Sequence, residues 1–168
     1  GRMDIVVHTM INAFFLSHNL RDDVELHLVF YGMPDPPKHI EIRVSKDTSL
    51  SKKDVANLLK KILYKYKPGK KTEAFPGCYI EKKSFLSVIE NLIDEGKEIF
   101  ILDKSGENLR KEKISFNSAF VIGDQNGLPK KELKRLKKIA KIISVGPQIY
   151  FASHVVTILN NEMDLRGL

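Results

Sequence analysis

Residues 119–129 read AFVIGDQNGLP, and residues 142–148 read IISVGPQ. Each stretch begins with a short apolar run and ends in a turn that contains glycine. The first turn leads into a basic segment from about Lys130 to Ala140, and the second leads into a segment from about Ala152 to Met163. Both segments are expected to be helices. Strand, turn and helix in alternation are typical of an α/β domain with parallel strands.

The rest of the chain also contains apolar patterns with the spacing of helices or of strands. Apolar residues at helical spacing predict helices, and alternating or continuous short apolar runs predict strands. Ser51 and Asp54 resemble a capping box, and Gly96 is expected to end a later helix. With no repeat or linker in the sequence, we expect a single domain over residues 1–168. The further expected elements are helices at 4–16, 51–64 and 84–95 and strands at 24–30, 40–44 and 99–102.

The two glycine turns are candidate ligand-binding loops. In open α/β sheets, ligands bind outside the carboxyl ends of the strands. Gly123 and Gly127 allow close approach of the backbone, and Gly146 with Pro147 exposes main-chain groups that could bind an adenine edge. Two ordinary tight turns are the alternative, and from the residues alone that alternative is favoured. Neither a dinucleotide fingerprint nor a phosphate-binding loop motif is present.

Composition excludes several protein classes. The chain has 168 residues and 42% hydrophobic residues, and no apolar run approaches the length of a membrane span. Cys78 is the single cysteine, so an internal disulfide is impossible and a reducing cytoplasm is expected. The five histidines show no HxxxH or HExxH spacing, and the sequence therefore predicts no metal.

Positive charge is concentrated in two blocks. The net charge of +7 divides into +7 over residues 45–83 and +4 over 119–168, against −2 over 1–44 and −2 over 84–118. Clustering of this kind indicates a phosphate-binding surface, and a solvated lysine-rich face is the alternative.

Aromatic side chains lie among the lysines of the first block. Tyr64, Tyr66 and Tyr79 interleave with lysines in a way that suits base stacking beside phosphate contacts. A mobile solvated loop explains the same pattern equally well. Near the N-terminus, polar groups gather at both ends of the 4–16 segment, where capping of a helix is the simpler explanation.

Several segments in a fixed order resemble one known family, the archaeal TrmY family of tRNA (pseudouridine-54) N1-methyltransferases, which belongs to the SPOUT or α/β-knot superfamily. The similarity covers nearly the whole chain. The segments that carry it include Gly1–Asp4, Asn12–His18, Tyr31–Pro37, Pro76–Ile80, Phe120–Asp124 and Ala152–His154. The family usually has a further strand before the first of these segments, so we expect that strand to be missing here.

The resemblance implies an α/β fold of the SPOUT type, with a mostly parallel sheet flanked by helices and a C-terminal trefoil knot. It also implies a homodimer that acts on tRNA with S-adenosylmethionine (SAM) as cofactor. Carried over position by position, the residues that would hold the cofactor are Leu102, Gly123, Val145, Gly146, Pro147, Gln148, Ile149, Tyr150 and Val155. The residues expected to bind RNA are His18, Arg21, Lys60, Lys61, Lys65, Lys67, Lys70 and Lys71.

The reaction that the resemblance implies needs a proton acceptor. Pseudouridine carries a free imino N–H, and a base must take this proton as the nitrogen attacks the methyl group. Asp4 is the first candidate with Arg2 beside it, and Asp23 is the second. The chain has Glu81 and Lys82 where the family usually has paired arginines, which reverses a charge where RNA contact is expected.

Three other functions are compatible with the sequence. The chain could methylate another RNA nucleotide, such as a pseudouridine of ribosomal RNA or a ribose 2′-hydroxyl. It could be a dimeric RNA-binding paralogue that has lost catalysis, which would bind RNA in a salt-sensitive way without binding SAM. A scaffold without an RNA partner is the third, and the two basic blocks disfavour it.

Overall fold

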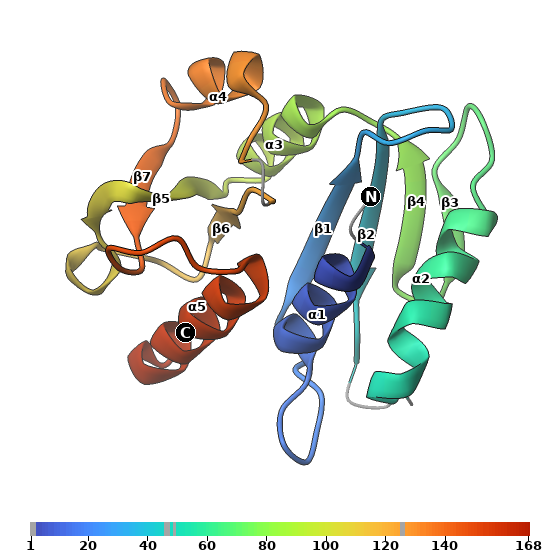
Figure 1. Ribbon diagram of the computed structural model, residues 1–168, viewed down its shortest axis with the longest axis horizontal. Helices are drawn as coiled ribbons and strands as arrows, with labels where there is room; N and C mark the ends of the chain where they lie inside the picture. Colours follow the sequence, from blue (N-terminus) through green and yellow to red (C-terminus); the bar gives the residue numbers. More distant parts are fainter. Residues whose placement is uncertain (1–2, 46–47, 49, 125–126) are drawn as a thin grey trace. The chain divides into compact units, whose positions relative to one another are not determined.

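The computed structural model describes residues 3–45, 48, 50–124 and 127–168. Arg2, one of the residues expected to act in catalysis, lies outside them. The chain forms two compact units, Gly1–Phe85 and Leu86–Leu168, and each unit contains its own sheet (Figure 1).

The first unit contains a four-stranded sheet in which every neighbouring pair is antiparallel. Its strand order is β1-β2-β4-β3. The elements of this unit are α1 (Met3–Phe14), β1 (Glu25–Phe30), β2 (Lys38–Arg43), η1 (Lys52–Asp54), α2 (Val55–Tyr64), β3 (Thr72–Phe75) and β4 (Cys78–Lys82).

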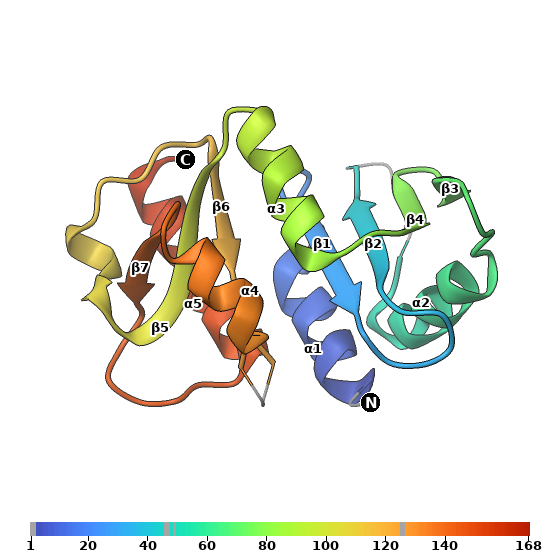
Figure 2. The same cartoon turned by 90° about the horizontal axis from the view of Figure 1, so that it is seen from above.

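The two faces of this sheet have different chemistry because successive side chains on a strand point to opposite faces. Ile40, Ile42 and Ile80 share one face and are at most 1% exposed. Helices α1 and α2 cover one face of the sheet (Figures 1 and 2), and their buried apolar side chains supply the rest of this core. The opposite face carries charged and polar side chains, among them His27 and His39, which lie on neighbouring strands.

The second unit contains a three-stranded parallel sheet of order β6-β5-β7. β5 is the central strand, and its residues Ile99 to Ile101 are nearly fully buried. The elements of this part of the chain are α3 (Phe85–Asp94), β5 (Glu98–Asn108), η2 (Leu109–Lys111), β6 (Ser118–Val121), α4 (Lys130–Leu136), β7 (Lys141–Ser144) and α5 (Ala152–Arg166).

The C-terminal helix α5 packs against the core of the second unit and is hydrogen-bonded to the segment that follows β5. Val155 and Leu159 of α5 belong to one core cluster with Phe100 of β5 and Ile143 of β7. At the end of α5, the Arg166 guanidinium donates to the carbonyl oxygens of Leu109 at 2.8 Å and Glu112 at 2.7 Å. These hydrogen bonds hold the end of α5 against η2 and the residue that follows it.

The predicted α/β class and parallel pairing are confirmed in the second unit. The expectation of a mostly parallel sheet is wrong for the first unit, because the connections β1–β2 and β3–β4 are too short for the crossover that parallel strands need. Within the described residues, no helix combines the length and the apolar composition needed to cross a lipid bilayer.

Two local predictions also need correction. The helix expected to reach Ala140 ends at Leu136, and turns continue the chain to β7. In the predicted capping box, the Ser51 hydroxyl donates to the Asp54 carboxylate at 2.7 Å, and Ser51 makes no side-chain cap hydrogen bond to the backbone. The helix expected at 51–64 therefore begins as the 3-10 turn η1.

Gly106 marks the tightest approach between β5 and β7, and it provides a test of this packing. A Cβ at this position would lie 2.6 Å from backbone atoms of Ile142 and Ile143, which cannot move without breaking the strand pairing. We expect Gly106→Ala to lower the free energy of unfolding by about 1–3 kcal/mol, measured by chemical denaturation. Gly32→Ala is the matched control because nothing lies within 4 Å of its Cβ position. Equal stability of the two variants would contradict the described packing.

Candidate functional site

The carboxyl ends of β6 and β7 flank β5, the central strand of the second unit's sheet. The register pairs Ile101 with Val121 of β6 and with Ile142 of β7, and pairs Leu102 with Ile143. Because β5 lies between β6 and β7, the turn after Val121 and the turn after Ser144 lie on either side of Leu102. The two glycine turns identified in the sequence therefore lie at the same end of the sheet. In open α/β sheets, ligands bind outside the carboxyl ends of the strands.

The turn after β6 folds back on itself at Gly123. A Cβ on Gly123 would lie 2.9 Å from the carbonyl carbon of Gly127 and 3.1 Å from the amide nitrogen of Leu128. The Gly127 N–H donates to the Asp124 carbonyl at 2.9 Å, and Gly127 has a φ of 78°, in the left-handed region that favours glycine. This turn needs glycine at both ends for steric reasons.

The turn after β7 is held by Ser144 and covered by Tyr150. The Ser144 hydroxyl donates to the Gly146 carbonyl at 2.8 Å and accepts from the Gly146 N–H at 3.1 Å. The Tyr150 phenol lies over Gly146, where its oxygen would be 2.5 Å from an added Cβ. Arg110 donates to the Val145 carbonyl at 3.4 Å, a contact that the sequence did not suggest.

The nine residues expected to hold the cofactor divide into three groups. Leu102, Gly123, Val145 and Gly146 come together through the strand ends, and Tyr150 lies against Gly146. Val155 is buried in the core cluster, against which Leu102 and Val145 also pack. The remaining three residues are exposed in the segment that leads to α5: Pro147, Gln148 and Ile149.

The carboxylates expected to act in catalysis lie in the first unit at different places. Asp4 is exposed in the first turn of α1, where its charge also suits the helix dipole. Asp23 is exposed two residues before β1, beyond the other end of α1. Since an α-helix rises about 1.5 Å per residue, Asp4 lies about 15 Å along α1 from Phe14, and the loop that leads to Asp23 begins at that far end.

The predicted RNA-binding residues are all surface residues of the first unit, although their side chains differ in availability. Exposed positions are His18, Lys60, Lys61, Lys65, Lys67, Lys70 and Lys71, whereas Arg21 is half-buried.

Lys71 and Lys65 differ from the other exposed residues, because their ammonium groups are engaged within the fold. The Lys71 ammonium lies 3.6 Å from a Glu41 oxygen, and the Lys65 ammonium lies against β3. The ammonium donates to the Ala74 carbonyl at 2.9 Å and lies 4.0 Å from the centre of the Phe75 ring. Of the aromatic residues expected to stack on bases, Tyr64 is 92% exposed, while Tyr66 donates its hydroxyl to Asp35.

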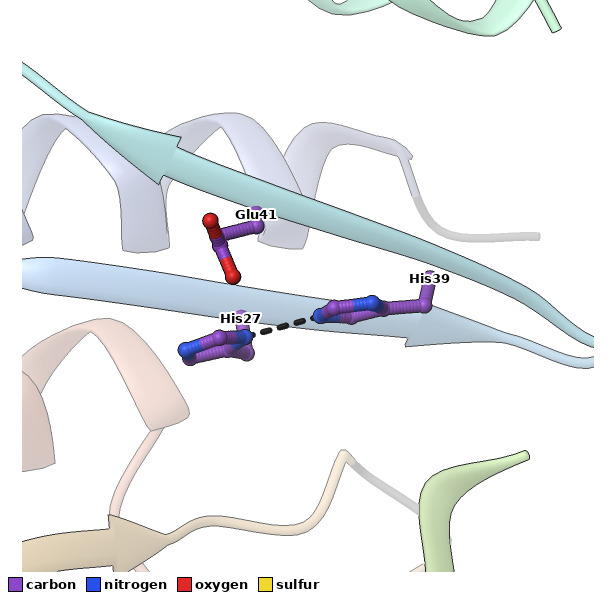
Figure 3. A group of neighbouring side chains, drawn as sticks. All are labelled: His27, His39 and Glu41. Carbon is purple, nitrogen blue, oxygen red and sulfur yellow. Dashed lines mark hydrogen bonds between the residues drawn. The ribbon is translucent and has the colours of Figure 1, made fainter. Parts of the chain in front are cut away.

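The structure also brings together residues that sequence reasoning missed. On the polar face of the first sheet, His27, His39 and Glu41 place their ligating atoms within 4.8 Å of one another (Figure 3). Glu81, expected near RNA, instead hydrogen-bonds to His39 at 2.9 Å. Burial lowers the pKa of His39, while the hydrogen bond from His27 and the guanidinium of Arg43 lower the pKa of Glu25 to about 2. In the sequence, this cluster could have been found from two expected strands in which a glutamate and a histidine are separated by one residue: Glu25-x-His27 and His39-x-Glu41.

Comparisons with known proteins show the family and the fold of this chain. Residues 1–168 match the family described as SAM-dependent RNA methyltransferases. The tRNA (pseudouridine(54)-N(1))-methyltransferase of Methanocaldococcus jannaschii is 34% identical over 177 residues, which cover 100% of this chain and 86% of that protein. The enzyme of the same name from Methanococcus aeolicus is 37% identical over 173 residues, covering 98% of this chain and 85% of the relative.

A solved structure shares the fold. Nep1 of Archaeoglobus fulgidus, bound to S-adenosylhomocysteine, superposes with a TM-score of 0.64 at 18% identity, covering 100% of this chain and 73% of that one. The match to the family along the whole chain, together with relatives above 30% identity, shows that this protein belongs to the family of SAM-dependent RNA methyltransferases.

Proposed function

We propose that this chain transfers a methyl group from SAM to N1 of pseudouridine 54 in tRNA. The observation that carries the proposal is the convergence of the Gly123 and Gly146 turns beside Leu102 at the carboxyl edge of a parallel sheet. The names of the relatives supply the nucleotide. Both units would act together as one SPOUT methyltransferase domain, working in the cytoplasm.

The residues at this edge fit the cofactor in chemistry. On the side where other residues carry a Cβ, Gly123 is packed against the backbone of Gly127 and Leu128, and Gly146 is covered by the Tyr150 phenol. The exposed segment 147–149 offers main-chain donors and acceptors to a ligand. Leu102 and Val145 are half-buried apolar side chains that would contact an adenine ring. When bound, SAM supplies a methyl sulfonium whose methyl group is electrophilic.

The protein's part in the reaction is to position the base and to accept one proton. In the proposal, Asp4 takes the imino proton of pseudouridine or orients that edge of the base, and Arg2 stands beside it in the sequence. Asp23 is the second candidate for the same role. Lysines of the first basic block and Arg21 would hold the phosphates. The transfer as outlined uses no metal ion.

A homodimer with knotted C-termini belongs to the same proposal. Ile149 is 86% exposed and Phe151 is 69% exposed, which leaves large apolar side chains beside the proposed cofactor edge for a ligand or a second subunit to cover. The knot rests on the resemblance of the sequence to the TrmY family.

Gly146→Ala tests the cofactor edge. The added Cβ would displace the Tyr150 phenol, which is the end of a flexible side chain, so the fold should tolerate the change while the binding surface does not. We expect SAM affinity, measured by calorimetry, to fall by about tenfold with little change in Tm. Gly32→Ala serves as the control. Unchanged SAM affinity in Gly146→Ala would place the cofactor elsewhere.

Asp4→Asn tests the proton acceptor. Loss of a general base typically costs at least about 100-fold in rate, so methylation of tRNA should fall by that factor while SAM affinity is unchanged. The measurement is mass spectrometry of tRNA incubated with isotope-labelled SAM, with the exposed Asp94→Asn as control. Full turnover in Asp4→Asn would transfer the role to Asp23.

The same mass spectra decide between the alternative functions. Methylation at pseudouridine 54 is the expected product. A methyl group on another nucleotide or on a ribose would support a related methyltransferase with a different target. RNA binding without SAM binding would indicate a paralogue that has lost catalysis.

Lys67 and Lys65 separate RNA contact from fold stability. We expect Lys67→Ala to weaken tRNA binding. The slope of log K against the logarithm of the salt concentration should become shallower by about the amount that one phosphate contact contributes. Lys65→Ala should instead lower the free energy of unfolding by about 1 kcal/mol, because the Ala74 carbonyl loses its donor. Equal salt slopes for wild type and Lys67→Ala would remove Lys67 from the RNA surface.

A further inference from the structure

Two imidazole rings lie side by side on the polar face of the first unit's sheet, one on β1 and one on β2 (Figure 3). The His27 Nδ1 and His39 Nε2 atoms are 2.8 Å apart, and the two rings are nearly parallel, with an interplanar angle of 8°. His39 is 3% exposed, and the His27 side chain is 18% exposed. This pair plays no part in the proposed methyl transfer.

The outer ring nitrogens of both histidines are bound to carboxylates. His27 Nε2 lies 2.8 Å from a Glu25 oxygen, and His39 Nδ1 lies 2.9 Å from a Glu81 oxygen. An ionised carboxylate only accepts hydrogen bonds, so each outer nitrogen carries the proton. In neutral imidazoles the two inner nitrogens then present lone pairs to each other at 2.8 Å. Such an arrangement is repulsive unless a proton or another cation lies between them.

A third ligand and the local charge favour a cation. Glu41 lies on β2, and one ligating atom from each of His27, His39 and Glu41 lies within 4.8 Å of the other two. Figure 3 shows the Glu41 carboxylate beside the two rings. Three carboxylates gather here, those of Glu25, Glu41 and Glu81. Two cationic side chains oppose them: Arg43 lies 2.9 Å from Glu25, and Lys71 lies 3.6 Å from Glu41. Before the imidazoles are counted, these five groups have an excess of one negative charge.

We propose that His27 Nδ1, His39 Nε2 and the Glu41 carboxylate bind a divalent transition-metal ion of the zinc class. Two imidazoles and one carboxylate are a ligand set that Zn²⁺ accepts, with a fourth position left for water. Tetrahedral Zn–N bonds of about 2.05 Å place two nitrogens about 3.3 Å apart, so the pair must open by only about 0.5 Å. Ligating histidines usually donate their other N–H to a carboxylate, and both histidines do so here.

The ion would link β1 to β2 in place of the shared proton. Because the ligands come from two strands, binding should stabilise the folded chain. The competing occupant is the proton alone, which would leave a hydrogen-bonded histidine pair with no metal affinity. Metal titration of the full-length chain separates the two possibilities.

Co²⁺ and Zn²⁺ are the probes for the wild-type chain. We expect one equivalent of Co²⁺ to give the visible d–d bands of a four-coordinate site, and one equivalent of Zn²⁺ to displace it and raise Tm. The X-ray absorption spectrum of the zinc-loaded wild type should contain two imidazoles in the first coordination shell. Absence of saturable binding, or a first shell without two imidazoles, would overturn the proposal and leave the shared proton as the occupant.

Matched variants locate the ion. Glu41→Gln keeps the side-chain shape and should lower Zn²⁺ affinity by at least about 100-fold, as should His27→Gln. Glu25→Gln removes only the outer carboxylate and should cost about 10–100-fold. His154→Gln changes an exposed histidine of α5 and should leave the affinity unchanged. Undiminished binding in both Glu41→Gln and His27→Gln would show that the metal binds elsewhere and would refute the assignment.

Discussion

Hydrogen bonding of β5 along both of its edges is the constraint on which the second unit depends. β6 and β7 pair with it in parallel on opposite sides, so the strand ends that lead into the turns at Gly123 and Gly146 flank β5 near Leu102, while β5 itself continues to Asn108, which pairs with Ser144. A site formed by backbone turns depends more on the lack of a side chain at Gly123 and Gly146 than on particular side chains elsewhere.

The first unit uses its sheet in another way. Its antiparallel strands bury one face under α1 and α2 and leave the other face polar, which is common for antiparallel sheets. On that polar face Glu25, His27, His39 and Glu81 form a continuous row of polar contacts, in which each carboxylate accepts a hydrogen bond from one histidine and the two ring nitrogens between the histidines are 2.8 Å apart. The reversed charge at Glu81 thus has a structural reason, because this carboxylate accepts a hydrogen bond from a buried histidine.

Local sequence patterns predicted most elements but not the way in which strands pair. The apolar runs at 119–122 and 142–145 are strands, and Gly96 follows the helix α3 that it was expected to end. The antiparallel sheet was missed because alternation along one strand does not specify the direction of its neighbour. Lys65 was interpreted as a phosphate ligand since its position in a basic run is visible in the sequence, whereas its hydrogen bond to Ala74 is not.

The α/β class, the two glycine turns and the segregation of positive charge are visible in the sequence alone, because periodicity, glycine placement and charge are local properties. Which distant residues meet depends on how the strands pair and pack. The register between β1 and β2 brings His27 within reach of His39, and the pairing of β2 with β4 brings Glu81 to the same histidine from 42 residues away. Cross-strand contacts follow from register and packing, which depend on the whole chain and not on any one segment.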